Sequence, residues 1–108
     1  MINTNEKAWI YNRSATGENN ALQKQSEAAH RFAIAHNFTV VSETSDIGNG
    51  LKYDHPGLSE MLSSVKSGKV STVVMRDISR IGRDVVKTLN IIRNDFEAHG
   101  VTLSCYTK

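Results

Sequence analysis

Short apolar runs alternate along the chain with segments of helical period. The runs are rich in β-branched and aromatic residues, which favour strands. They cover residues 8–12, 38–43, 70–75 and 101–106. The run at 70–75 is apolar enough to be buried on both faces of a sheet.

The segments between these runs have the spacing of amphipathic helices. The apolar positions that define the helices are Leu22, Ala29, Phe32 and Ala33; Leu58, Met61, Leu62 and Val65; and Val85, Leu89, Ile92 and Phe96. Asn20 followed by Gln23 resembles a capping box at the start of the first helix. Asn37 can take the left-handed conformation that ends a helix, and Gly68 and Gly100 are expected to end the other two.

The resulting order, β-α-β-loop-α-β-α-β, predicts an α/β fold: a three-layer sandwich with a mainly parallel sheet of about four strands flanked by helices. The long loop, residues 45–55, contains two glycines and precedes Pro56, which suits the first turn of a helix. In such sheets, sites form where loops leave the carboxyl ends of the strands. Those loops hold residues 13–18, 46–55 and 76–83, so we expect these segments to meet at one edge.

Length and composition limit the class of protein. The 108 residues suffice for one domain, and we expect a leader at 1–6 and a single domain at 7–108. No apolar run is long enough to cross a bilayer, the N-terminus lacks the features of a signal peptide, and the lone Cys105 cannot form an internal disulfide. These features predict a cytoplasmic protein.

Motifs for cofactors are missing from the sequence. The four histidines and one cysteine have no ligand spacing, so no metal site is expected. There is no phosphate-binding glycine loop and no dinucleotide fingerprint, so neither a nucleotide nor another cofactor is expected.

The distribution of charge is more informative than its sum, which is +2. Arg80 and Arg83 lie three residues apart at the start of a predicted helix, and Arg13 leaves the first strand at the same edge. Arginine offers a planar fork of donors that matches phosphate oxygens. Three guanidinium groups around one point would repel one another unless an anion lay between them. The alternative is a solvated helix face paired with Asp77 and Asp84.

Several neutral or acidic side chains could complete such a site. Ser14 and Thr16, beside the positive charge of Arg13, are candidate nucleophiles, although hydroxyls at strand ends often bond to their own backbone. Asp46 could orient an arginine, manage a proton or simply form a turn. His55 could contact a phosphate or cap the helix that follows.

Four further residues belong to the candidate set. Tyr11 points to the same side of its strand as Arg13, with half-buried packing as its alternative role. Gln25 lies on the first predicted helix. Arg76 and Lys87 flank the arginine pair and are candidate DNA contacts.

Taken together, these segments resemble the catalytic domain of the serine site-specific recombinases, the resolvase/invertase family. The matching motifs are Tyr11-x-Arg13 with an adjacent serine, Leu22-x-x-Gln25, Asp46-x-x-Asn49-Gly50, His55-Pro56-Gly57-Leu58, Ser79-Arg80-Ile81-Gly82-Arg83-Asp84 and the ending Gly100-Val101-Thr102-Leu103. They cover nearly the whole chain, from about residue 7 to 106, in the order and spacing of the family.

The resemblance implies a mechanism. In the family, a serine hydroxyl attacks a DNA phosphodiester and forms a 5′-phosphoserine link without metal or nucleotide, and subunits of a dimer or tetramer exchange strands in resolution, inversion, integration or the movement of mobile elements. Carried over, Arg13, Arg80 and Arg83 would clamp the phosphate. Asp46 and Gln25 would support the site.

The chain also departs from the family. The nucleophile position, two residues after the matching arginine, is Ala15; Ser14 comes one residue early, and counting back from Leu22-x-x-Gln25 gives Thr16 instead. Of the two hydroxyls we prefer Ser14. His55 stands where the family has an arginine, and the chain ends before the family's long dimerisation helix and helix-turn-helix domain.

Three hypotheses follow from these matches and departures. The first is a DNA-cutting recombinase domain. The second is a catalytically inactive relative that acts as a dimerisation or regulatory module. The third is a small enzyme that uses the arginine pocket for a phosphate or carboxylate ligand.

Overall fold

The apolar runs form one sheet in the computed structural model, which describes residues 6–107. The sheet has four strands in the order β2-β1-β3-β4, and every pair is parallel. The strands are β1 (Lys7–Ser14), β2 (Thr39–Ile47), β3 (Thr72–Met75) and β4 (Thr102–Cys105). Residues 1–5 of the expected leader lie outside the described residues.

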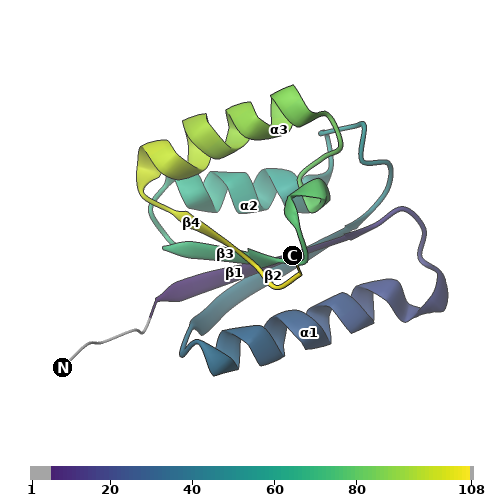
Figure 1. Ribbon diagram of the computed structural model, residues 1–108, viewed down its shortest axis with the longest axis horizontal. Helices are drawn as coiled ribbons and strands as arrows, with labels where there is room; N and C mark the ends of the chain where they lie inside the picture. Colours follow the sequence, from purple (N-terminus) through teal and green to yellow (C-terminus); the bar gives the residue numbers. More distant parts are fainter. Residues whose placement is uncertain (1–5, 108) are drawn as a thin grey trace.

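Helices cover both faces of this sheet (Figure 1). Helix α1 (Ala21–Ala35) lies on one face, and α2 (Pro56–Lys66) and α3 (Val85–Ile91) lie on the other. Two apolar clusters fill the spaces between the layers. The smaller one, beneath α1, joins Ile10 and Val74 of the sheet to Ala29. The larger one, beneath α2 and α3, includes Trp9, Leu58, Met61 and Phe96. The predicted three-layer α/β fold is therefore confirmed.

The first two strands are longer than the sequence pattern indicates. β1 runs to Ser14, and β2 continues to Ile47 through residues 45–47, which the sequence assigns to a loop. The parallel ladder explains the difference, since Arg13 pairs with Asp46 and Ser14 pairs with Ile47. Backbone pairing here outweighs the low strand preference of serine and aspartate.

Helix α1 begins directly after Asn20, as predicted, but the predicted capping box does not form; the predicted helix ends are confirmed. Asn20 has φ 53° and makes no side-chain capping bond, because a 3₁₀ turn (η1, Glu18–Asn20) leads into the helix. Asparagine adopts this left-handed conformation more readily than most residues. Asn37, Gly68 and Gly100 all have positive φ at or near the ends of their helices, as expected.

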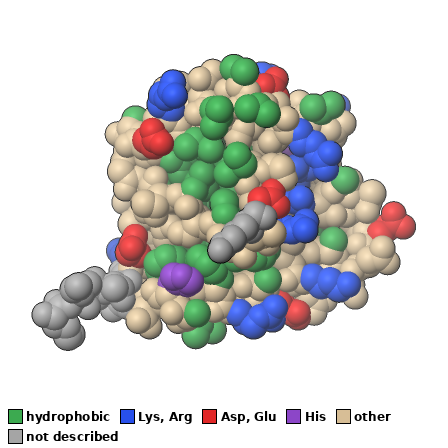
Figure 2. All heavy atoms as spheres, viewed as in Figure 1, with side chains coloured by type: hydrophobic (Ala, Val, Ile, Leu, Met, Phe, Trp, Pro, Cys, Tyr) green, Lys and Arg blue, Asp and Glu red, His purple; other side chains and the backbone are tan. Residues whose placement is uncertain are grey.

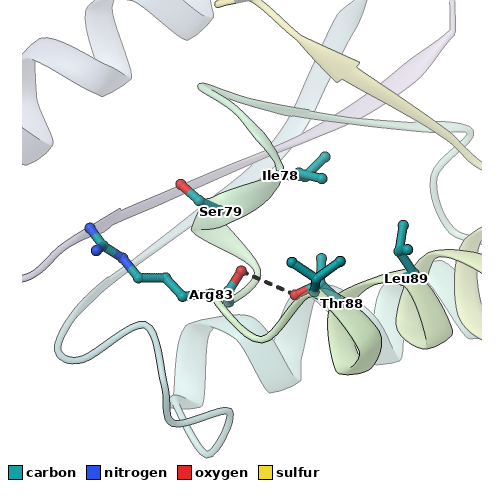
Figure 3. A pocket seen from close by; sticks show the side chains of 7 residues that line it. Ile78, Ser79, Arg83, Thr88 and Leu89 are labelled. Atoms are coloured by element: carbon teal, nitrogen blue, oxygen red, sulfur yellow. Dashed lines mark hydrogen bonds between the residues drawn. The ribbon is translucent and has the colours of Figure 1, made fainter.

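Helix α3 does not bury the apolar face that its spacing suggests. The side chains of Val85 and Leu89 are 69% and 48% exposed, whereas Thr88 is buried. Thr88 Oγ1 donates to Gly82 O at 3.0 Å, which turns this polar residue inward (Figure 3). The helix then passes into a π-helical turn (η3, Ile92–Phe96) and a 3₁₀ turn (η4, Glu97–His99). Only at Phe96 is the predicted apolar face fully buried.

No segment that could cross a membrane is expected from the hydropathy pattern. Across the described residues, none of the helices combines the length and apolar character that a membrane span requires.

Candidate functional site

A cavity of about 560 Å³ opens at the carboxyl edge of the sheet. Its walls come from the end of β1, the loop after β2 and the segment between β3 and α3. The lining residues are Arg13, Ala15, Asn49, Gly50, Leu51, Arg80 and Arg83. The expected convergence of the edge loops therefore brings the three arginines to one cavity, which we call the arginine pocket.

The Arg13 side chain is buried, and within the described residues its guanidinium donates only to backbone carbonyls. Its Nε donates to Arg80 O at 3.0 Å, its Nη1 to Gly48 O at 2.8 Å and its Nη2 to Ser79 O at 2.6 Å. Burial lowers the pKa of this guanidinium, and the neighbouring charge of Arg80 lowers it further. Arg13 thus joins β1 to two edge loops and adds positive charge to the pocket.

Arg80 belongs to a 3₁₀ turn, η2 (Ile78–Arg80), that follows β3. Its Nη1 donates to Arg13 O at 2.6 Å, so the two arginines hold each other's backbone. Its Nε is buried and makes no hydrogen bond within residues 6–107, and Asp77 Oδ1 lies 3.8 Å away. Asp77 itself caps η2 by accepting from Ser79 N at 3.0 Å. Arg80 therefore retains a donor without a partner.

Arg83 is the exposed arginine of the pocket. Its backbone N donates to Gly50 O at 2.8 Å, which fixes the loop after β2 against the start of α3. A Cβ at Gly50 would lie 2.8 Å from both Arg13 Nη2 and Arg83 Cγ, so only glycine allows this approach. The Arg83 side chain extends away from Ile78 and Leu89 (Figure 3), which leaves its guanidinium available to a ligand.

Hydrogen bonds hold the residues around the arginine pocket in place. They involve Tyr11, Asp46 and Gln25. Tyr11 is buried and donates to Asp46 Oδ2 at 2.7 Å, and burial together with this bond raises the pKa of the phenol well above its usual value. Asp46 also accepts from Gly57 N and Leu58 N at 2.9 and 2.8 Å, so it anchors the start of α2. The amide of Gln25 bonds to both backbone groups of Arg13.

The two candidate hydroxyls do not line the pocket. Ser14 is 8% exposed, and its hydroxyl donates to Thr16 O. Thr16 is exposed, and its Oγ1 accepts from Glu18 N at 3.4 Å. Between them, Ala15 is the residue that lines the arginine pocket.

The three candidate DNA contacts lie in different surroundings. His55 is buried, and its Nε2 lies 2.9 Å from Asn49 O, so the ring braces the loop after β2. Lys87 is exposed, with its Nζ 5.2 Å from the centre of the Tyr53 ring. Arg76 is exposed beyond the end of β3.

Sequence reasoning missed Tyr53. Its hydroxyl accepts from Asp84 N at 3.1 Å and lies 2.9 Å from Thr88 Oγ1, and its ring packs against Gly82. Tyr53 thus ties the loop after β2 to the start of α3, where Arg83 lies. The sequence signal for it is a single aromatic residue within the long loop. The described residues contain no cluster of metal-ligating side chains.

The structure is thus an all-parallel α/β domain with a cationic pocket at the carboxyl edge of its sheet. Residues 8–108 match the family model described as the N-terminal domain of resolvase. Because this match spans almost the whole sequence, the chain belongs to the resolvase family of serine recombinases, as the resemblance of its motifs implied.

Solved structures of this family share the fold. A resolvase family site-specific recombinase from Streptococcus pneumoniae is 32% identical, with a TM-score of 0.70 over 93% of this chain and 71% of the other. The catalytic domain of TP901-1 integrase is 23% identical, with a TM-score of 0.83 over 92% and 77%. The catalytic domain of ISC1926 TnpA, an IS607-like serine recombinase, matches equally well at 23% identity over 94% and 70%.

Proposed function

We propose that this chain binds a backbone phosphate of DNA in the arginine pocket and does not cut the strand itself. The observation that carries this proposal is Ala15, which occupies the pocket beside Arg13, Arg80 and Arg83 where a nucleophile would be needed. The chain would then act as a dimerisation or regulatory module of a recombination system.

The pocket has the chemistry of a phosphate site. The unpartnered Nε of Arg80 and the free guanidinium of Arg83 supply charge-assisted donors, while Arg13 fixes the shape. The positive charges of Arg13 and Arg80 are partly desolvated, so an anion between them relieves their repulsion. Lys87 would add a contact beyond the pocket.

Strand cleavage through Ser14 or Thr16 is the second candidate. It is favoured by their position, since both flank Ala15 at the end of β1 and Thr16 is exposed. The serine or threonine oxygen would attack phosphorus and form the bond to the 5′ phosphate. The 3′ oxygen would leave and take up the proton that the attacking hydroxyl releases, while Arg80 and Arg83 stabilised the charge on the transition state. This route requires the end of β1 to twist.

Trapping covalent adducts separates the two candidates. The full chain is incubated with a pool of nicked duplexes of random sequence, and protein–DNA adducts are mapped by mass spectrometry. We expect no adduct from wild type, Ser14→Ala or Thr16→Ala. The Ala15→Ser variant is expected to form one at position 15, because its hydroxyl would enter the pocket.

A wild-type adduct lost in only one hydroxyl variant would name the nucleophile and overturn the non-cleaving proposal. Arg83→Gln is the binding control: it is expected to weaken DNA binding about tenfold, the loss of roughly one good phosphate contact. Dimer or tetramer formation and a cytoplasmic location stay predictions. The exposed apolar side chains of Val85, Val86 and Leu89 support the former.

A further inference from the structure

A second cavity lies on the opposite face of the same sheet edge, beside α1. It has a volume of about 300 Å³. Its lining residues are Ala21, Lys24, Gln25, Ala28, Arg76 and Tyr106. None of them is acidic, and the small side chains of Ala21 and Ala28 leave the cations accessible.

The two cations of this cavity are weakly paired. Lys24 is exposed and forms no ion pair within residues 6–107. The Arg76 side chain is 48% exposed, and its carboxylate neighbour, Asp77 Oδ2, lies 3.9 Å from its Nε. The other carboxylate oxygen of Asp77, Oδ1, accepts the hydrogen bond that caps η2. Both cations are therefore free to turn toward an anion.

The ring of Tyr106 forms one wall of the cavity. Its hydroxyl donates to Gln25 O at 3.2 Å, and its ring centre lies 6.4 Å from that of Phe32. Burial raises the pKa of this phenol, and the charges of Arg76 and Arg80 oppose the rise. The cavity thus combines an aromatic ring with two cations.

The second cavity is linked to the arginine pocket through Gln25. Gln25 lines the cavity and bonds through its amide to the backbone of Arg13. Arg76 follows β3, which pairs with β1 on one side and β4 on the other. Figure 2 shows Lys and Arg side chains in a row along the right-hand edge of the molecule, from the region of α3 to that of α1.

We propose that Lys24, Arg76 and Tyr106 form a second DNA-binding subsite, which holds a backbone phosphate beyond the one in the arginine pocket. The proposal rests on the proposed function, because it extends the same DNA contact around the sheet edge. Its ligand is the phosphodiester of duplex DNA, held without base recognition, since phosphate contacts position a protein but do not specify sequence.

The test measures binding of a fluorescent duplex to the full chain by anisotropy across a salt series. The variant Lys24→Gln/Arg76→Gln is compared with Lys69→Gln/Arg93→Gln, which removes the same charge from exposed positions away from the cavity. Thermal unfolding shows whether each variant folds. We expect the cavity variant to bind about tenfold more weakly, with a slope of log K against log salt that is smaller by about 2, whereas the control changes much less.

Arg83→Gln is measured in parallel to separate the two proposals. Equal effects of the cavity variant and its charge control would overturn the second subsite, and a loss in Arg83→Gln alone would leave only the arginine pocket. A loss in the cavity variant alone would instead overturn the proposed role of the arginine pocket. Wild type that binds no duplex at low salt would overturn both.

Discussion

At the end of β1, three backbone carbonyls surround the guanidinium of Arg13, those of Gly48, Ser79 and Arg80. These carbonyls belong to the loop after β2 and to the segment between β3 and α3. Replacing the arginine by lysine would retain the charge but could satisfy fewer of the three acceptors, since an ammonium cannot span the fork. Arg13 is therefore expected to matter as much for stability as for binding.

We predict that Arg13→Lys lowers the free energy of unfolding by about 2–4 kcal/mol, because each buried carbonyl left without a donor costs about 1–3 kcal/mol. Urea denaturation followed by circular dichroism measures the change. Arg83→Lys is the matched control: its side chain is exposed, so its effect should stay within about 0.5 kcal/mol. Similar losses in the two variants would contradict this role for Arg13.

The arginine cluster was predictable from the sequence, but the partners of each arginine were not. Topology places Arg13, Arg80 and Arg83 at one edge, since parallel strands end together. A guanidinium can donate to a carbonyl oxygen or to a phosphate oxygen. Which of them lies within reach depends on how the loops fold. The same limit applies to Ala15, whose place in the pocket depends on how β1 ends.

Among the elements, the segment from Gly82 to α3 is held by the ring of Tyr53 from the loop after β2. We predict that Gly82→Ala destabilises the fold by about 1–3 kcal/mol, because a Cβ there would overlap the Tyr53 ring. The ring would have to move, and the loop would loosen with it. Limited trypsin digestion should then cut at the exposed Lys52 faster than in wild type.

Gly17→Ala provides the control, because the atom nearest to its added Cβ belongs to a side chain that can move. Its Cβ would lie 3.2 Å from the flexible end of Ile47, which can shift, so both stability and the rate of cleavage at Lys52 should stay close to wild type. Unchanged trypsin cleavage in Gly82→Ala would show that Tyr53 does not restrain the loop.

Helical spacing predicted that α1, α2 and α3 exist, but it was a poorer guide to how α3 packs. Spacing shows which residues share a face and does not show whether that face meets the core. In α2, the predicted positions Leu58, Met61 and Val65 are buried. In α3, the hydrogen bonds of Thr88 rotate the helix and leave Val85 and Leu89 exposed.

Over the whole molecule, charge and burial are arranged asymmetrically. The net charge is only +2, yet both cavities at the carboxyl edge are lined by cations. The net charge alone therefore gives little support for a DNA-binding face. The strand order supports one, because it brings the cations together at one edge of the sheet. Beneath this edge, Tyr11 and Asp46 form a buried hydrogen-bonded pair. We expect the free energy of unfolding of the whole domain to depend on this bond.

This pair predicts how stability depends on alkaline pH. Burial and the bond to Asp46 raise the pKa of Tyr11 above its ordinary value of 10.0. The unfolded chain would release this proton near pH 10, whereas the folded chain retains it. The contribution of Tyr11 to stability is thus complete below about pH 10 and is lost as the pH rises further.

We predict that Tyr11→Phe unfolds more easily near neutral pH, because Asp46 loses a donor, but loses less additional stability between about pH 10 and pH 12. Urea midpoints measured across this range give the two slopes. Tyrosinate absorbance in the native protein offers an independent check, since the signal of Tyr11 should emerge together with unfolding. Parallel pH profiles for wild type and Tyr11→Phe would contradict the coupling. In that case the start of α2 would be held to β2 by the bonds of Asp46 to Gly57 and Leu58, without a contribution from Tyr11 of β1.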